Sequence, residues 1–348
     1  MKKQRLFLMM AATLLASLLP TFKAKAQNGD LAVRINPILS YSTARDGHIA
    51  FDTFFAPLQT GAEQMNLRGQ VKIILQKIGV KTDFTFGQTT DTICFNRKGG
   101  FTRIASPKVD QMNPGKKYPP TVYSFNYKED ACTGYVFREW NDNANFDHPI
   151  EHRNVITYEY DQKGRLSKQW YKVYFEDKDG KLHESHLGFT KDPQLAMEYD
   201  QEGRPDAASV GSEERVKYNA QGLLTLWMYM NNPDVKASEF IYNKEGRLSA
   251  AKYYSLDGMD EVEYIETNST ITYNEKGDIA KIVTSCWNCN SKWAHVRRQN
   301  TITTSYTYTY DQQGNWTLVT VKETERGRTI PKGTIERAIT YWSKDESK

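Results

Sequence analysis

Apolar and polar positions alternate in short runs along most of this 348-residue chain. In one such run Ile156, Tyr158 and Tyr160 fall on one side, with Thr157 and Glu159 between them. Because successive side chains of a β-strand point to opposite faces, this period of two predicts strands. Convincing stretches with the helical period of 3.6 are absent, so the pattern predicts a mainly β protein.

A five-residue motif follows many of these runs: an aromatic residue, Asp or Asn, two polar residues and Gly. Asp or Asn suits the first position of a type I turn, because its side chain accepts a bond from the backbone N–H two residues on. Gly supplies the positive φ that such a turn with a G1 bulge requires. Seven copies end in a turn glycine: Gly99, Gly164, Gly203, Gly222, Gly246, Gly277 and Gly314. An eighth copy, Phe125-Asn126, lacks the glycine.

Each copy therefore predicts a strand, a tight turn and a second strand. The spacing between copies is irregular, which fits constant-period solenoids and propeller blades less well. We expect an array of antiparallel β-hairpins forming an open twisted meander sheet over residues 61–342. A closed β-barrel or a propeller is the alternative fold.

The motif resembles the YD repeats of bacterial Rhs-type and related secreted proteins, and above all the short members of unknown function. The most similar stretch is Tyr308-Thr309-Tyr310-Asp311-Gln312-Gln313-Gly314-Asn315-Trp316, and the resemblance extends over roughly residues 61 to 342. It implies a β-hairpin array. It carries over no catalytic motif and no cofactor, so the chain is expected not to be an enzyme.

The first 26 residues have the features of a signal peptide. Lys2, Lys3 and Arg5 precede an apolar run, and Ala24-Lys25-Ala26 fits a cleavage site that leaves Gln27 as the new N-terminus. Residues 27–60 read as a lead-in segment and residues 343–348 as a C-terminal tail.

The whole chain has a net charge of +4, but residues 1–26 hold five basic residues and no acid, so the mature chain is nearly neutral. This balance predicts no nucleic-acid partner. No second apolar run is long enough to span a bilayer as a helix.

The sequence His148-Pro149-Ile150-Glu151-His152 matches the inverted zincin pattern H-x-x-E-H. That pattern binds zinc through two His one helical turn apart, with Glu as the base. Here Pro149 interrupts the motif and a strand is expected soon after it. A polar loop is therefore the favoured interpretation, and a zinc metallohydrolase the minor alternative. His183 and His186 lie three apart in an expected strand, so they face opposite sides and predict no metal site.

Four cysteines remain after export to an oxidising compartment, where disulfides are the ordinary outcome. Cys286 and Cys289 form a single C-x-x-C, whereas a zinc ribbon needs two such pairs. If Cys286 to Cys289 is a β-turn, its ends are close enough for a disulfide. Cys94 and Cys132 are candidates for a second bridge, although nothing in the sequence fixes their separation.

Function is less well defined than architecture. The favoured hypothesis is an exported, non-enzymatic β-repeat scaffold or binding protein of the bacterial cell envelope, periplasmic rather than fully secreted, with an unknown protein or carbohydrate ligand. A glycan- or peptidoglycan-binding module is the alternative, because exposed aromatic side chains stack on sugar rings. Its candidate residues are Trp140, Trp170, Trp227, Trp287, Trp293, Trp316 and Trp342.

Overall fold

A computed structural model describes residues 60–80, 89–108, 118–141, 149–177, 179–185, 192–210, 214–229, 232–256, 263–287 and 299–343. The expected signal peptide and lead-in segment lie outside these ranges, except Thr60. No helix in the described part of the chain is long and apolar enough to cross a membrane.

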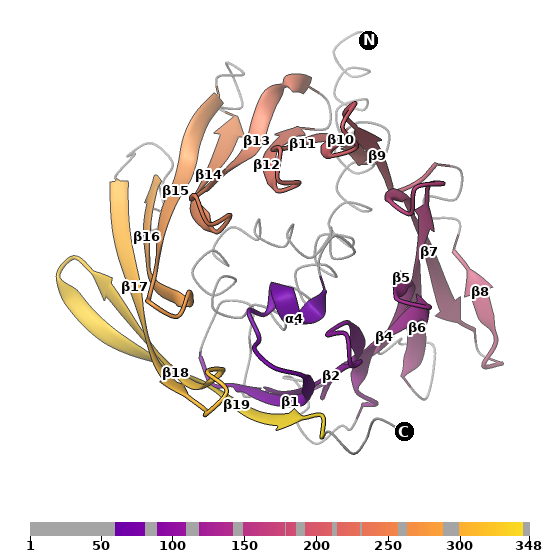
Figure 1. The fold of residues 1–348 in the computed structure, drawn as a ribbon, viewed down its shortest axis with the longest axis horizontal. Helices are drawn as coiled ribbons and strands as arrows, with labels where there is room; N and C mark the ends of the chain where they lie inside the picture. Colours follow the sequence, from indigo (N-terminus) through magenta and orange to yellow (C-terminus); the bar gives the residue numbers. More distant parts are fainter. Residues whose placement is uncertain are drawn as a thin grey trace, which may run out of the picture.

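The described residues form one short helix and nineteen β-strands (Figure 1). These are α4 (Gly61–Gln64), β1 (Val71–Ile78), β2 (Thr89–Phe95), β3 (Phe101–Ser106), β4 (Thr121–Lys128), β5 (Ala131–Asn141), β6 (Ile150–Tyr160), β7 (Leu166–Glu176), β8 (Leu182–Glu184), β9 (Leu195–Tyr199), β10 (Pro205–Val210), β11 (Glu214–Tyr218), β12 (Leu224–Tyr229), β13 (Asn232–Tyr242), β14 (Leu248–Leu256), β15 (Glu263–Tyr273), β16 (Ile279–Trp287), β17 (Gln299–Tyr310), β18 (Trp316–Glu325) and β19 (Arg328–Tyr341).

The strands close into an antiparallel barrel, and the predicted open meander is wrong. β1 pairs with β2 on one side and with β19 on the other: Ile74 lies opposite Ile93 and also opposite Ile339. β8 and β9 occupy consecutive parts of one edge of β7, so β8 adds to the wall without interrupting it. Without β8, eighteen strands form the closed ring. Closure pairs both edge strands, which an open sheet would leave with unpaired N–H and C=O groups.

One face of the wall is apolar and points inward. On β1, Ile74 and Ile78 are buried whereas Leu75 between them is 46% exposed. The position of α4 shows that this apolar face points inward, because α4 lies inside the ring (Figure 1) and contacts the face. A Cβ added to Gly61 of α4 would lie 2.6 Å from the Phe101 ring, which belongs to the same apolar face. We call this face the inner wall. Its fully buried aliphatic residues are Ile74, Ile93, Ile104, Leu195, Val216, Ile282, Val319 and Val321.

The opposite face is mostly polar and carries charges around the circumference, although Leu75 and Ile241 are exposed on it. Strand alternation and pairing place one exposed charged side chain on each of eight strands of this outer face: Arg103, Arg138, Lys172, Glu198, Arg215, Lys281, Lys322 and Glu336. Several form ion pairs within the face, such as Arg215 with Glu198 at 3.0 Å. The two faces therefore alternate as the sequence predicts, with the apolar set inside and the charged set outside.

Candidate functional site

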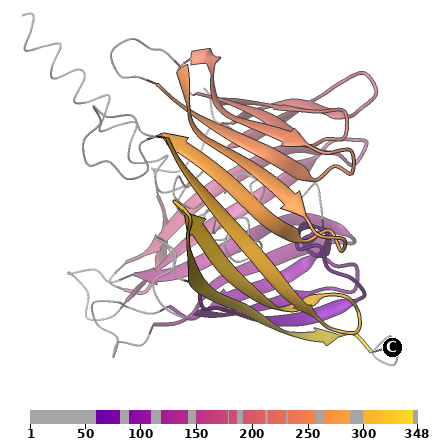
Figure 2. The same cartoon turned by 90° about the vertical axis from the view of Figure 1, so that its left-hand side faces the viewer.

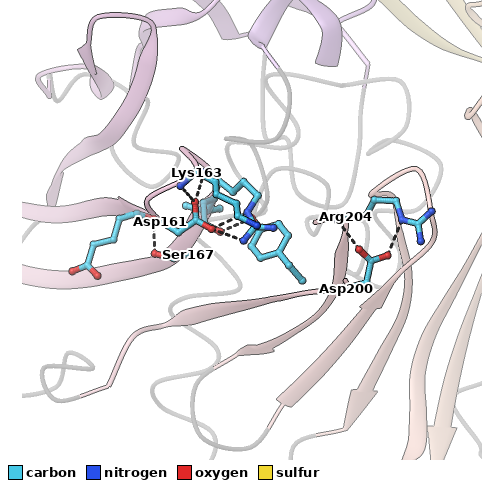
Figure 3. Close-up of polar contacts among 9 residues, drawn as sticks. Asp161, Lys163, Ser167, Asp200 and Arg204 are labelled. Carbon is cyan, nitrogen blue, oxygen red and sulfur yellow. Dashed lines mark hydrogen bonds and ion pairs between the residues drawn. The ribbon is translucent and has the colours of Figure 1, made fainter. Parts of the chain in front are cut away.

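The repeated turns share one hydrogen-bond pattern, which Asp161 illustrates (Figure 3). Its carboxylate Oδ1 accepts bonds from the backbone N–H groups of Lys163 and Arg165, both at 2.9 Å. The N–H of Gly164 donates to the Asp161 carbonyl at 2.9 Å. The two bonds to Oδ1, together with the Arg165 guanidinium, hold the pKa of Asp161 below its ordinary value. Asp or Asn at this position thus satisfies backbone donors that the tight turn would leave unpaired.

The seven turn glycines all adopt the left-handed conformation. Their φ angles lie between +74° at Gly246 and +84° at Gly314. Consecutive strands run in opposite directions, so these turns gather at one end of the barrel, which we call the turn rim. Figure 2 shows the strands crossing the wall obliquely between this end and the other.

The structure also departs from the sequence-based turn assignments. The glycine-free copy Phe125-Asn126 lies within β4, and the turn follows at Glu129, which has φ of +56°. Conversely, Asp177 begins a turn with the same bonding and with Gly180 at φ of +76°. The dipeptide Asp179-Gly180 predicts a two-residue hairpin turn at this place. The structure has a turn there, but it begins at Asp177 and has the Asp-x-x-Gly spacing of the repeated motif, with Glu176 in place of the aromatic residue.

The aromatic residue of the motif joins neighbouring hairpins. The hydroxyl of Tyr242 donates to the carbonyl of Leu224, two residues after the glycine of the preceding turn, at 2.8 Å. Tyr160, Tyr199 and Tyr273 make the equivalent bond to Cys132, Leu166 and Leu248, at 2.6, 2.5 and 2.7 Å. In the last copy the bond comes from Tyr308, two residues before the aromatic residue of the motif, and goes to Ile279 at 2.5 Å. Tyr is favoured over Phe because its ring packs on the inner wall while its hydroxyl satisfies a backbone acceptor at the turn rim.

The segment from Thr60 to Gln70 crosses the turn rim and joins three of its turns. The N–H of Ala62 donates to Gly99 at 2.8 Å, and the side chain of Asn66 donates to Asp278 at 3.0 Å. Arg68 donates to the carbonyls of Gly314 and Lys276, and its N–H donates to the Asn315 side chain at 2.7 Å. These contacts link the turn at Gly99 to the turns at Gly277 and Gly314, which are distant from it in the sequence, so they brace this end of the closed ring.

The inner wall changes character along the barrel axis. Near the turn rim it is aromatic: Phe95, Phe101, Phe125 and Tyr135 form a chain of ring contacts 5.2–5.5 Å apart. Farther from the turn rim, across β19, β1, β2 and β3, a row of buried polar side chains replaces the apolar ones: Arg337, Gln76, Asp91 and Ser106. Arg337 donates through Nε to Gln76 at 2.9 Å, and Ser106 donates to Asp91.

The other candidate residues do not assemble into a site. Glu151 and His152 are consecutive in β6, so they point to opposite faces and form no part of a metal-binding helix. Glu151 instead pairs with Arg153 at 2.8 Å. No cluster of three potential metal ligands occurs among the described residues. The zinc-hydrolase alternative therefore loses the geometry that it requires; His148 itself lies outside the described residues.

The cysteines and tryptophans are similarly dispersed. Cys94 and Cys132 are both free, so the suggested bridge between them is wrong. Cys289 lies outside the described residues, and Cys286 is the penultimate residue of β16.

Trp227 and Trp316 are buried in the inner wall, at 4% and 5% exposure. The glycan-binding alternative depends on aromatic side chains that are exposed on the surface, and these two are not, which weakens it.

No protein-family model matches the chain, and no curated protein matches it. The YD-repeat resemblance thus has no support from a family model. Among solved structures, the chain is similar to a porin-like protein from Bacteroides uniformis (15% identity, TM-score 0.35) and to one from Bacteroides vulgatus (7% identity, TM-score 0.26). Each alignment covers 78% of this chain and 98% of the other. It is also similar to TcdB2-TccC3 (10% identity, TM-score 0.23), with 71% of this chain aligned to 14% of that one. Similarities at these TM-scores indicate no function.

Proposed function

We propose that this chain is an exported, non-enzymatic binding protein of the bacterial envelope, which stands in an aqueous compartment and holds an apolar ligand against the inner wall of its barrel. The features of residues 1–26 support export by a signal peptide. The inner wall supports an apolar ligand, because it concentrates aromatic and aliphatic side chains while the outer face carries the charges.

The observation that carries this proposal is the direction in which the two faces point. A barrel that crosses a membrane presents an apolar band to lipid and a polar interior, and a Lys or Arg on the lipid face costs about 2–4 kcal/mol near the bilayer midplane. This barrel has the opposite arrangement. Arg103, Arg138, Lys172 and Arg215 project outward from four strands. A membrane channel is the competing function, but this outer face would be poorly solvated by lipid.

Purification of the mature chain from the periplasm, without detergent, tests the proposal. We expect the protein to partition into the aqueous phase of Triton X-114 and to bind the neutral apolar fluorophore N-phenyl-1-naphthylamine saturably. Recovery in the detergent phase, with stepwise conductance in planar bilayers, would establish a membrane channel instead. A folded aqueous barrel that does not bind the fluorophore would overturn the apolar-ligand part of the proposal.

A further inference from the structure

Arg337 is a charged side chain in an almost wholly buried position. It lies on the inner wall in β19 with 5% of its surface exposed. The centre of its guanidinium lies 3.4 Å from the centre of the Trp316 ring. Its Nε donates to Gln76 at 2.9 Å, but the buried Nη1 has no hydrogen-bond partner. One edge of the guanidinium is therefore held in place while part of its donor capacity is unused.

Two carboxylates are candidates to neutralise Arg337. The charge of Asp278 acts on it, and Asp91 lies opposite its partner Gln76, but both accept hydrogen bonds from other donors. Asp278 accepts bonds from Asn66 at 3.0 Å and from the Tyr310 hydroxyl at 2.9 Å. Asp91, opposite Gln76 in β2, accepts a bond from Ser106. No ion pair to Arg337 occurs among the described residues. The field of Asp278 favours the cation, but no carboxylate occupies the free edge of the guanidinium.

An unpaired buried charge is costly. Removing an ion from water costs several kcal/mol even after relaxation, and hydrogen bonds or an opposite charge must offset that cost. Burial is the main reason why the pKa of Arg337 falls to about 9, so the side chain still carries its charge at neutral pH. The fold therefore maintains a preoriented cation at the end of a row of buried polar side chains, next to the buried apolar residues Ile335 and Val319.

We propose that Arg337 is the anion-binding point of the inner wall, and that the ligand is an amphiphile with an apolar body and one anionic group, a carboxylate or a sulfonate. The proposal rests on the function proposed above, which supplies the apolar body. Arg337 adds the anionic group: a carboxylate at Nη1 would complete the donor set and neutralise the buried charge. Gln76 and Trp316 act as positioning residues, because each fixes the guanidinium plane and neither neutralises it.

Two related fluorophores test the proposal on the full mature chain. 1-Anilinonaphthalene-8-sulfonate shares its aromatic body with N-phenyl-1-naphthylamine and adds one sulfonate. In Arg337→Met we expect the affinity for the sulfonate to fall on the order of 10- to 100-fold, the range for a hydrogen bond to a charged group, with the affinity for the neutral probe unchanged. Arg103→Met, which removes the same charge from the outer face, should leave both affinities unchanged.

Gln76→Glu covers the case in which Arg337→Met fails to fold. It keeps the acceptor for Arg337 Nε and supplies an internal carboxylate, so the barrel should remain folded and sulfonate binding should fall as in Arg337→Met. Unchanged sulfonate affinity in both folded variants, or in Gln76→Glu alone if Arg337→Met is unfolded, would overturn the proposal. Failure of the wild-type barrel to bind the neutral probe would instead refute the apolar-ligand function, and so separates the two ideas.

Discussion

Two turn glycines with the same backbone conformation should differ in their importance for stability. Gly164 and Gly314 have φ of +75° and +84°. A Cβ at Gly164 would meet no atom within 4 Å, whereas one at Gly314 would lie 3.4 Å from Arg68 Cδ. Gly164→Val therefore isolates the cost of a β-branched residue at positive φ. At Gly314 a Cβ alone would already be in van der Waals contact with Arg68, so we expect the two γ-methyl groups of Val to displace Arg68 as well.

The magnitudes follow from these contacts. Backbone strain at positive φ should cost each variant about 1–3 kcal/mol. Displacing Arg68 would also remove its bonds to the carbonyls of Gly314 and Lys276. A hydrogen bond to a charged group contributes about 1.5–3 kcal/mol, so Gly314→Val should lose at least about that much more than Gly164→Val. Since each kcal/mol shifts Tm by about 2 °C in a chain of this size, the two variants should differ by a few degrees.

Thermal unfolding and urea denaturation of the wild type and both variants supply the measurement. A cycle with Arg68→Ala then assigns the difference: the excess cost of Gly314→Val should disappear in the Arg68→Ala background. Equal losses in the two glycine variants would show that Arg68 adds no stability to the turn rim. Unchanged Tm in both would contradict the turn conformation itself.

Three further predictions concern separate features. Tyr273→Phe removes the hydroxyl bond to Leu248 and should cost about 1 kcal/mol of unfolding free energy. The control Tyr174→Phe, which removes a hydroxyl 3.4 Å from Glu184, should cost less. Equal losses in the two variants would contradict the role of the tyrosine bonds. The hydrogen bond from Lys252 is the main reason why the pKa of Glu239 falls to about 2, so its contribution is complete above the unfolded value of about 4.5 and is lost as the pH falls towards 2. The stability difference between wild type and Glu239→Gln should accordingly shrink over that range, and a difference independent of pH would refute the assignment. Thiol counting on unfolded, unreduced periplasmic protein should give two free thiols if Cys286 and Cys289 are bridged, and four would contradict the bridge.

The local units of this fold follow from short stretches of sequence. Asp161, Gly164 and the N–H groups of the same turn interact within five residues, so their spacing was sufficient to predict the turn and its two strands. Alternation likewise identified one apolar and one polar face, because the period of two is a property of each strand alone. The motif and the turn do not coincide at two places. The aromatic residue Phe125 lies inside a strand, before its turn, and the turn at Asp177 has no aromatic residue before it.

Closure of the sheet, and the choice of the face that lies inside, depend on contacts between distant parts of the chain. Closure depends on the pairing of β1 with β19, where Gln76 meets Arg337 across 261 residues, and no local pattern encodes a contact of that separation. Alternation along β19 puts Arg337 on the same face as Ile335 and Ile339, but only closure of the ring turns that face inward and buries the charge. Local hydrogen bonds therefore fix the hairpins, whereas the sum of strand tilt and register around the whole ring fixes closure and the surroundings of each buried residue.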